Sequence, residues 1–139
     1  MRILALDPGE KRIGVALSDP TGFVARPLTT LAHTSREADA ARVAALAAEH
    51  GAEMILVGIA LDAADARGPQ ARRAERLAEA IRQHTALPVQ LHDESFSTQT
   101  AQTAMLAAGK KRRARRKQVH AVAAAAILQS YLDAHSRRD

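Results

Sequence analysis

Carboxylates stand near the ends of two apolar runs in the sequence. Asp7 follows the run ILAL, and Asp93 and Glu94 end the run PVQLHDE. Each has an ordinary explanation, since Asp-Pro-Gly is common in turns and acids are favoured near helix N-termini. If both runs are strands ending at one edge of a sheet, the carboxylates meet there and need a cation to stay ionised. Paired divalent cations ~3.5–4 Å apart hydrolyse phosphodiester bonds in many nucleases.

A histidine begins the alanine-rich run near the C-terminus. Counted in helical steps, His120 shares one stripe with Ala123, Ala124, Ile127 and Tyr131, which predicts a buried face. Two interpretations stay open at this point. His120 is either a core histidine with one hydrogen-bond partner or a side chain that does chemistry.

A basic segment explains the positive charge of the chain. Residues 110–117, KKRRARRK, contain seven of its twenty Lys and Arg residues and no acid. They are Lys110, Lys111, Arg112, Arg113, Arg115, Arg116 and Lys117. A solvated loop is one interpretation. The mutual repulsion of seven cations in eight positions is, however, relieved best by a polyphosphate partner. We expect a mobile loop that binds nucleic acid, with Lys11 and Arg12 of the first turn adding to it.

The pattern of apolar residues predicts the elements that position these groups. We expect strands at 2–7, 13–19, 21–28, 53–59 and 88–94, and helices at 36–50, 68–84, 95–109 and 117–132. The order β-β-β-α-β-α-β-α-α predicts an α/β fold, in which a three-strand antiparallel meander and parallel strands form one mixed sheet flanked by helices. Ligands of such sheets gather at the carboxyl ends of the parallel strands.

Length and composition limit the class of protein. We expect 139 residues to form a single domain, 1–139, with a core of small and aliphatic side chains, because aromatic residues make up only 2%. The absence of cysteine excludes disulfides and thiolate metal sites. No apolar run approaches the ~20 residues of a membrane span, so we expect a soluble cytoplasmic protein.

Four blocks of the sequence carry a resemblance to a known family. The blocks that carry the resemblance are ALDPGEKRIGVALSDPTG, VGIALDAADARGPQARR, LHDESFST and AAAAILQSYLD. Over nearly its whole length the chain resembles the YqgF/RuvX family of Holliday junction resolvases. The resemblance implies a ribonuclease-H-like fold. It also implies a metal-dependent nuclease that acts on branched DNA or on the 5′ end of the 16S ribosomal RNA precursor.

The resemblance also implies the site residues. The family's first two metal-binding acids correspond to Asp7 and Glu94, and we expect Asp93 to orient its neighbours without binding metal. The third acid, an aspartate at the start of the last helix, is replaced here by His120. The implied catalytic and metal-binding set is therefore Asp7, Glu94 and His120. An imidazole suits Mn²⁺ better than Mg²⁺, so we expect Mn²⁺ to be favoured.

Two other functions were weighed against the nuclease. LDPGEKRIGVAL also resembles the phosphate loop of actin-like kinases and ATPases, but those proteins need two lobes that close over a nucleotide. The alternative is a non-catalytic nucleic-acid-binding or ribosome-assembly factor. Because there are few aromatic rings on which bases could stack, recognition of backbone and shape fits either function better. A monomer or a homodimer is compatible with the sequence, although symmetric cutting of a junction calls for two subunits.

Overall fold

A computed structural model of the chain describes residues 1–60, 68–93 and 112–136, the last range partly as backbone alone (112–118 and 136). The elements in chain order are β1 (Ile3–Pro8), β2 (Arg12–Ser18), β3 (Ala25–Ala32), α1 (Arg36–Glu49), β4 (Met54–Ile59), α2 (Pro69–Arg82), β5 (Val89–Asp93) and α4 (Arg112–Ser136). The predicted helix 95–109 lies outside the described residues.

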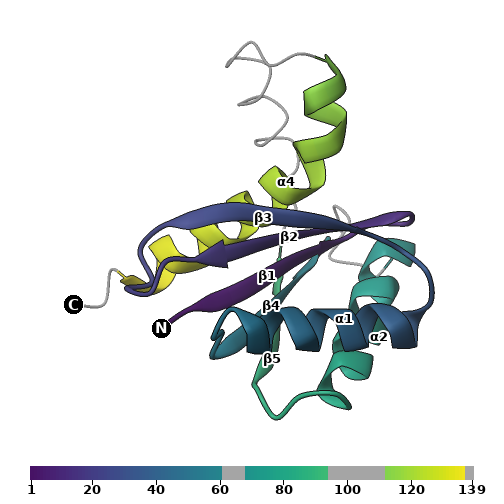
Figure 1. Ribbon diagram of the computed structural model, residues 1–139, viewed down its shortest axis with the longest axis horizontal. Coiled ribbons are helices and arrows are strands. Elements are labelled where there is room, and N and C mark those ends of the chain that lie inside the picture. Colours follow the sequence, from purple (N-terminus) through teal and green to yellow (C-terminus); the bar gives the residue numbers. More distant parts are fainter. Residues whose placement is uncertain (61–67, 94–111, 137–139) are drawn as a thin grey trace.

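The five strands form one mixed sheet in the order β3-β2-β1-β4-β5. β1, β2 and β3 pair antiparallel, as the short turns between them predict, and β4 is parallel to both β1 and β5. The predicted mixed sheet is confirmed. Because β1, β4 and β5 run in one direction, their carboxyl ends lie at the same edge of the sheet (Figure 1).

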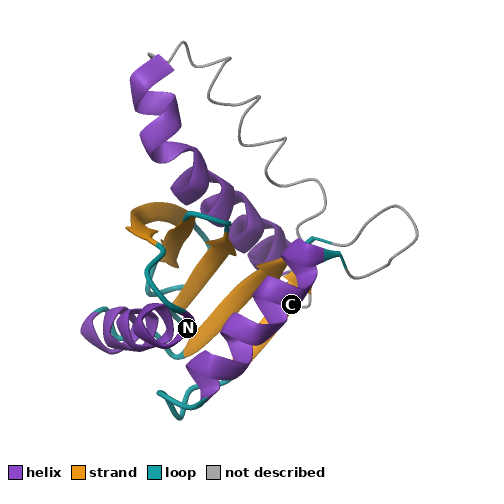
Figure 2. Ribbon diagram, turned by 90° about the vertical axis from the view of Figure 1, so that its right-hand side faces the viewer, coloured by secondary structure: helices purple, strands orange, loops and turns teal. Residues whose placement is uncertain are grey.

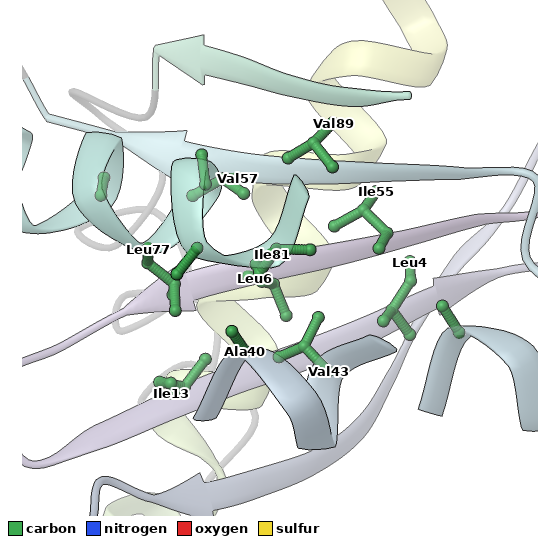
Figure 3. Packing of buried hydrophobic residues seen from close by; sticks show 14 of the residues in the cluster. Leu4, Leu6, Ile13, Ala40, Val43, Ile55, Val57, Leu77, Ile81 and Val89 are labelled. Carbon is green, nitrogen blue, oxygen red and sulfur yellow. The ribbon is translucent and has the colours of Figure 1, made fainter. Parts of the chain in front are cut away.

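Helices cover both faces of the sheet (Figure 2). Leu4 and Leu6 of β1 join the larger core, which includes Val43 of α1 and Ile81 of α2 (Figure 3). Ile3 and Ala5 of the same strand join the second core, which lies under α4. Alternate residues of β1 therefore face opposite layers, and this alternation decides where Asp7 points.

The third strand begins later than the sequence predicts. We expected residues 21–28, whereas β3 is Ala25–Ala32. The carboxylate of Asp19 accepts hydrogen bonds from the amides of Phe23 and Val24, at 2.8 and 2.9 Å, and holds residues 19–24 in a turn. These bonds hold the pKa of Asp19 well below its usual range, the largest contribution coming from the Thr21 hydroxyl. The prediction missed this local competition for backbone donors.

The last helix begins earlier than predicted and corrects the expectation of a loop. α4 starts at Arg112, so residues 112–117 of the basic segment are helical. Arg, Lys and Ala are strong helix formers, and no glycine or proline follows Gly109. The first turns of α4 project beyond the sheet (Figures 1 and 2). None of the helices in the described ranges is long and apolar enough to span a membrane.

A buried carboxylate fixes the start of α1. Asp39 is 1% exposed and contacts His33, the amide of Thr34 at 3.2 Å and Nη2 of Arg42 at 2.6 Å. Burial by itself raises the pKa of this carboxyl, but the hydrogen bonds from His33 and Arg42 outweigh burial and hold the pKa below its ordinary value of 3.8. The anionic form of Asp39 therefore stabilises the fold at neutral pH.

We expect Asp39→Asn to lower the free energy of unfolding at pH 7 by about 2 kcal/mol, since the amide leaves buried donors without their carboxylate. The folded pKa of Asp39 lies below the unfolded one, so the stabilisation is present above pH 3.8 and is lost as pH falls through the folded pKa. Urea unfolding at pH 7 and at pH 3 measures the change. A difference between the two proteins that is equally large at both values would contradict the assignment.

Candidate active site

Asp7 lies near the carboxyl end of β1, the central strand of the sheet. Its side chain shares the face of Ile3 and Ala5, which is covered by α4. In the antiparallel register Asp7 stands directly opposite Gly14 of β2. The sequence correctly placed this acid at the mouth of a core strand.

The side chain of Asp7 is largely buried, and no described residue donates a hydrogen bond to its carboxylate. Three polar side chains of the described residues are buried, namely Asp7, Ser18 and Asp39. Ser18 accepts a hydrogen bond from the amide of Ile3 at 2.7 Å, and Asp39 accepts the bonds given above. Within the described part of the chain nothing donates to Asp7, which is 7% exposed. A buried, unpaired carboxylate is unfavourable, and a bound cation relieves it.

Gly14 brings the last helix onto the strand beside Asp7. A Cβ atom built on Gly14 would lie 1.9 Å from the carbonyl oxygen of His120 and 2.9 Å from the amide nitrogen of Ala121. The backbone of α4 therefore rests directly on β2 at this residue, which only glycine permits. Asp7 is the register partner of Gly14, so the backbone of α4 at His120 packs beside the strand pair that contains Asp7.

The ring of His120 lies at the edge of the core rather than inside it. His120 is half-buried, whereas Ala123, Ala124 and Ile127 of the same stripe are fully buried. Its Cε1 atom is 3.7 Å from the position that a Cβ on Gly9 would take. Gly9 follows β1 directly, so the imidazole lies over the turn after Asp7.

The acids that end β5 are only partly described. Asp93 pairs in register with Ile59, is exposed, and by strand alternation shares the face of Leu91, opposite to that of Asp7. Glu94, the other predicted acid, lies outside the described residues. In the portion of the chain that is described, no three His, Asp or Glu side chains gather as a metal site. That Asp93 orients its neighbours without binding metal stays a prediction.

Gln70 is a positioning residue that the sequence did not reveal. It stands in the first turn of α2, where its Oε1 accepts a hydrogen bond from the amide of Ala60 at 2.6 Å. Its Nε2 donates to the carbonyl of Pro8 at 3.4 Å. One side chain thus ties the carboxyl ends of β1 and β4 together. A glutamine after Gly-Pro has no pattern that predicts such a bridge.

A second histidine faces α4 near the same edge. The ring of His92 packs edge-on against Tyr131 with centroids 5.6 Å apart, and Nε2 lies 3.5 Å from Oγ of Ser130. Burial lowers the pKa of His92, and the negative charge of Asp93 opposes this only in part. His92 is therefore a neutral group at pH 7 that fixes β5 against α4. Its only signal in the sequence is its place inside the run PVQLHDE, next to Asp93.

The turn after β1 presents the two predicted basic residues. Gly9 donates its amide hydrogen to the carbonyl of Arg12 at 2.8 Å, which closes the turn. Lys11 and Arg12 are exposed and project from this turn, close in sequence to Asp7. Of the seven cations in the basic segment, Lys110 and Lys111 lie outside the described residues, and the others are described as helical backbone only.

In this sheet only β2 runs antiparallel to the other four strands, and the central strand β1 carries the largely buried Asp7. The fold is similar to that of ribonuclease-H-like resolvases. RuvC from T. thermophilus, solved in complex with a Holliday junction substrate, matches 98% of this chain and 96% of its own with a TM-score of 0.60 at 18% identity. The resolvase of Fowlpox virus, solved with Holliday junction DNA, matches with a TM-score of 0.58 at 12% identity, over 96% of this chain and 98% of its own.

The sequence narrows this class to one family. Residues 1–134 match the family model of RuvX, described as Holliday junction resolvase, and the chain belongs to this family. A relative from Myxococcus xanthus is 40% identical, covering 100% of this chain and 92% of its own length. One from Clostridium beijerinckii is 41% identical, over 99% and 100%. Both bear the name "Putative pre-16S rRNA nuclease".

Proposed function

We propose that this protein is a divalent-metal-dependent nuclease that hydrolyses phosphodiester bonds in structured nucleic acid. The names of relatives about 40% identical make pre-16S rRNA the first substrate to test. Holliday junction DNA is the second, because it is the substrate in the family's description. Both are folded polyanions, which suits recognition through phosphates rather than bases.

The observation that carries this proposal is the unpartnered carboxylate of Asp7. A carboxylate buried beside the last helix without a donor has no structural use among the described residues, yet it lies where ligands of parallel sheets bind. Oxygen donors suit hard divalent cations. The donor chemistry of Asp7 therefore fits the metal that the family implies.

Asp7, Glu94 and His120 are the residues that would hold the metal. When bound, a divalent cation supplies charge neutralisation at the phosphate and a more acidic water. The chain itself supplies position: Gly14 lets α4 approach β1, Gln70 ties the strand ends, and Lys11 and Arg12 offer positive charge to the substrate backbone. Each of these contributions fixes geometry before the substrate binds.

A cleavage panel tests the proposed function. Purified protein is incubated in Mg²⁺ or Mn²⁺ with four substrates of equal label: a four-way DNA junction, duplex DNA, single-stranded DNA and an RNA hairpin carrying the 5′ extension of precursor 16S rRNA. We expect divalent-dependent cuts in the RNA or the junction and none in single strands. No cutting of any substrate in either metal would leave the non-catalytic binding or assembly factor as the better function.

We expect His120→Asp to shift the ratio of Mn²⁺-supported to Mg²⁺-supported cleavage toward Mg²⁺ by about tenfold. The physical reason is that a carboxylate replaces a nitrogen ligand and adds a negative charge. His120→Ala should instead weaken Mn²⁺ binding by about 10–100-fold, as loss of one ligand does. Its effect on stability should be small, because His120 is half-buried and alanine favours helices.

Mn²⁺ titration and thermal unfolding of the three proteins separate the two interpretations of His120. A core histidine predicts that both substitutions lower the melting temperature and that neither changes metal preference. That pattern would remove His120 from the proposed ligand set, with Asp7 unaffected by the result.

A further inference from the structure

A basic cleft lies on the face of the sheet opposite α4. It has a volume of about 450 Å³ and is enclosed by the turn after β1, the start of α1 and one side of α2. Figure 1 shows these three segments at the same end of the sheet. Six acidic or arginine side chains are among its lining residues: Glu10, Arg36, Asp39, Arg72, Arg73 and Arg76.

The arginines of α2 face this cleft in a regular array. Arg72, Arg73 and Arg76 are spaced three and four residues apart on one helix face, and Arg36 approaches from α1. Within the described residues, no carboxylate forms an ion pair with Arg36, Arg73 or Arg76. The like charges of these three arginines repel each other around one cleft, so the empty cleft is electrostatically unfavourable.

The acidic residues of the cleft do not balance this charge. Asp39 is buried and already contacts His33 and Arg42, so its negative charge is matched locally. Glu10 is exposed in the turn after β1 and remains as the other carboxylate of the lining. Among the described lining residues, Arg36, Arg73 and Arg76 thus share the cleft with one acid that forms no ion pair, Glu10.

The helix ends add to the positive potential. Arg36 is the first residue of α1, where a cation opposes the helix dipole, although Glu37 and Asp39 stand in the same turn. α2 begins at Pro69, which also lines the cleft, and its first turn contains no acid. Two helix N-termini and four arginines therefore converge on one volume. Such an arrangement is unfavourable for folding alone and favourable for binding an anion.

We propose that this cleft binds backbone phosphates of the nucleic acid at a distance from the bond that is cleaved. The guanidinium fork matches two phosphate oxygens at once, and several forks can hold consecutive phosphates. The inference rests on the proposed function, because the nucleic acid that is cleaved at the Asp7 site would contact the protein a second time in this cleft.

The cleft and the Asp7 site are joined through the β1–β2 hairpin. Pro8 and Ile13 line the cleft, and each is the chain neighbour of a residue on the other face, Asp7 and Gly14 respectively. A folded nucleic acid that wraps this edge of the sheet reaches both faces. This geometry selects branched or hairpin substrates over a single straight strand.

Binding of a fluorescein-labelled four-way DNA junction and of an RNA hairpin tests the proposal, with EDTA present so that no cleavage occurs. Arg73→Gln/Arg76→Gln should weaken the Kd for the tighter probe by about tenfold. It should also flatten the slope of log K against log salt by about 1–2, as expected for one or two lost phosphate contacts. Glutamine keeps helix propensity, and circular dichroism checks the fold.

The matched control is Arg26→Gln/Arg82→Gln, which removes the same charge from exposed positions outside the cleft. We expect its salt slope to stay that of the natural protein. Equal changes in both double variants would overturn the proposal and leave only a diffuse positive field. Arg73→Lys/Arg76→Lys keeps the charge without the fork, and it should recover the salt slope but only part of the affinity.

Inorganic phosphate distinguishes a nucleic-acid site from a site for small anions. It should compete with the junction or hairpin for the natural protein more than for the glutamine variant. If phosphate raises the melting temperature through the cleft while both proteins bind nucleic acid equally well, the proposal is wrong. These binding results do not depend on cleavage, so failure of the panel above would leave them interpretable.

Discussion

Replacing Asp7 with asparagine is expected to lower the rate of phosphodiester cleavage by about 10³-fold or more, which corresponds to about 4 kcal/mol of lost transition-state stabilisation. Asparagine keeps the shape but removes the negative charge that holds the cation. The same substitution should raise the melting temperature of the metal-free protein by roughly 3–5 °C, because a buried carboxylate without a donor becomes neutral. Single-turnover cleavage and thermal unfolding in EDTA measure the two effects.

Opposite signs for activity and stability are the signature of a functional carboxylate. Asp19→Asn is the matched control, since it makes the same chemical change in the turn between β2 and β3 at the other end of the sheet. There the carboxylate accepts bonds from Phe23 and Val24, so we expect lower stability with cleavage retained. An Asp7→Asn protein that unfolds earlier and keeps its cleavage rate would make Asp7 a structural residue.

Replacing Gly14 with alanine is expected to lower the free energy of unfolding by about 3 kcal/mol, or roughly 10 °C in melting temperature. The new Cβ would lie 1.9 Å from the His120 carbonyl oxygen, and the obstacle is backbone rather than a side chain that can rotate away. α4 must therefore move off β2. Because Asp7 is the register partner of Gly14, cleavage should also fall at temperatures where the variant is folded.

Gly68→Ala is the control for the loss of a glycine. Gly68 has φ −82° and nothing within 4 Å of its would-be Cβ, so we expect a change below about 1 kcal/mol. Chemical denaturation of the two variants gives the comparison. Equal stability of the Gly14 and Gly68 variants would show that α4 does not rest on β2 at this residue.

The sequence by itself determined the elements whose boundaries are set by local residues. α1 ends where Gly51 adopts a positive φ of 67°, as the glycine after residue 50 predicts. Gly68-Pro69 starts α2, and the continuous apolar run 53–59 gives a strand buried on both faces. The position of Asp7 at the end of a core strand follows from the same local logic.

The tertiary structure decided what depends on contacts between distant residues. The third strand is Ala25–Ala32 and not 21–28, because the first of the predicted residues form the turn that Asp19 holds. Residues 112–117 of the basic segment, predicted as a loop, are the first residues of α4. Arg73 and Arg76 of α2 line a cleft, because the turn after β1 and the start of α1 lie beside that side of the helix. Periodicity records which side of an element is apolar, but it carries no information about which backbone will pack against it. The packing of the α4 backbone at His120 onto β2, opposite Asp7, is therefore known only from the structure, where the missing side chain of Gly14 makes room.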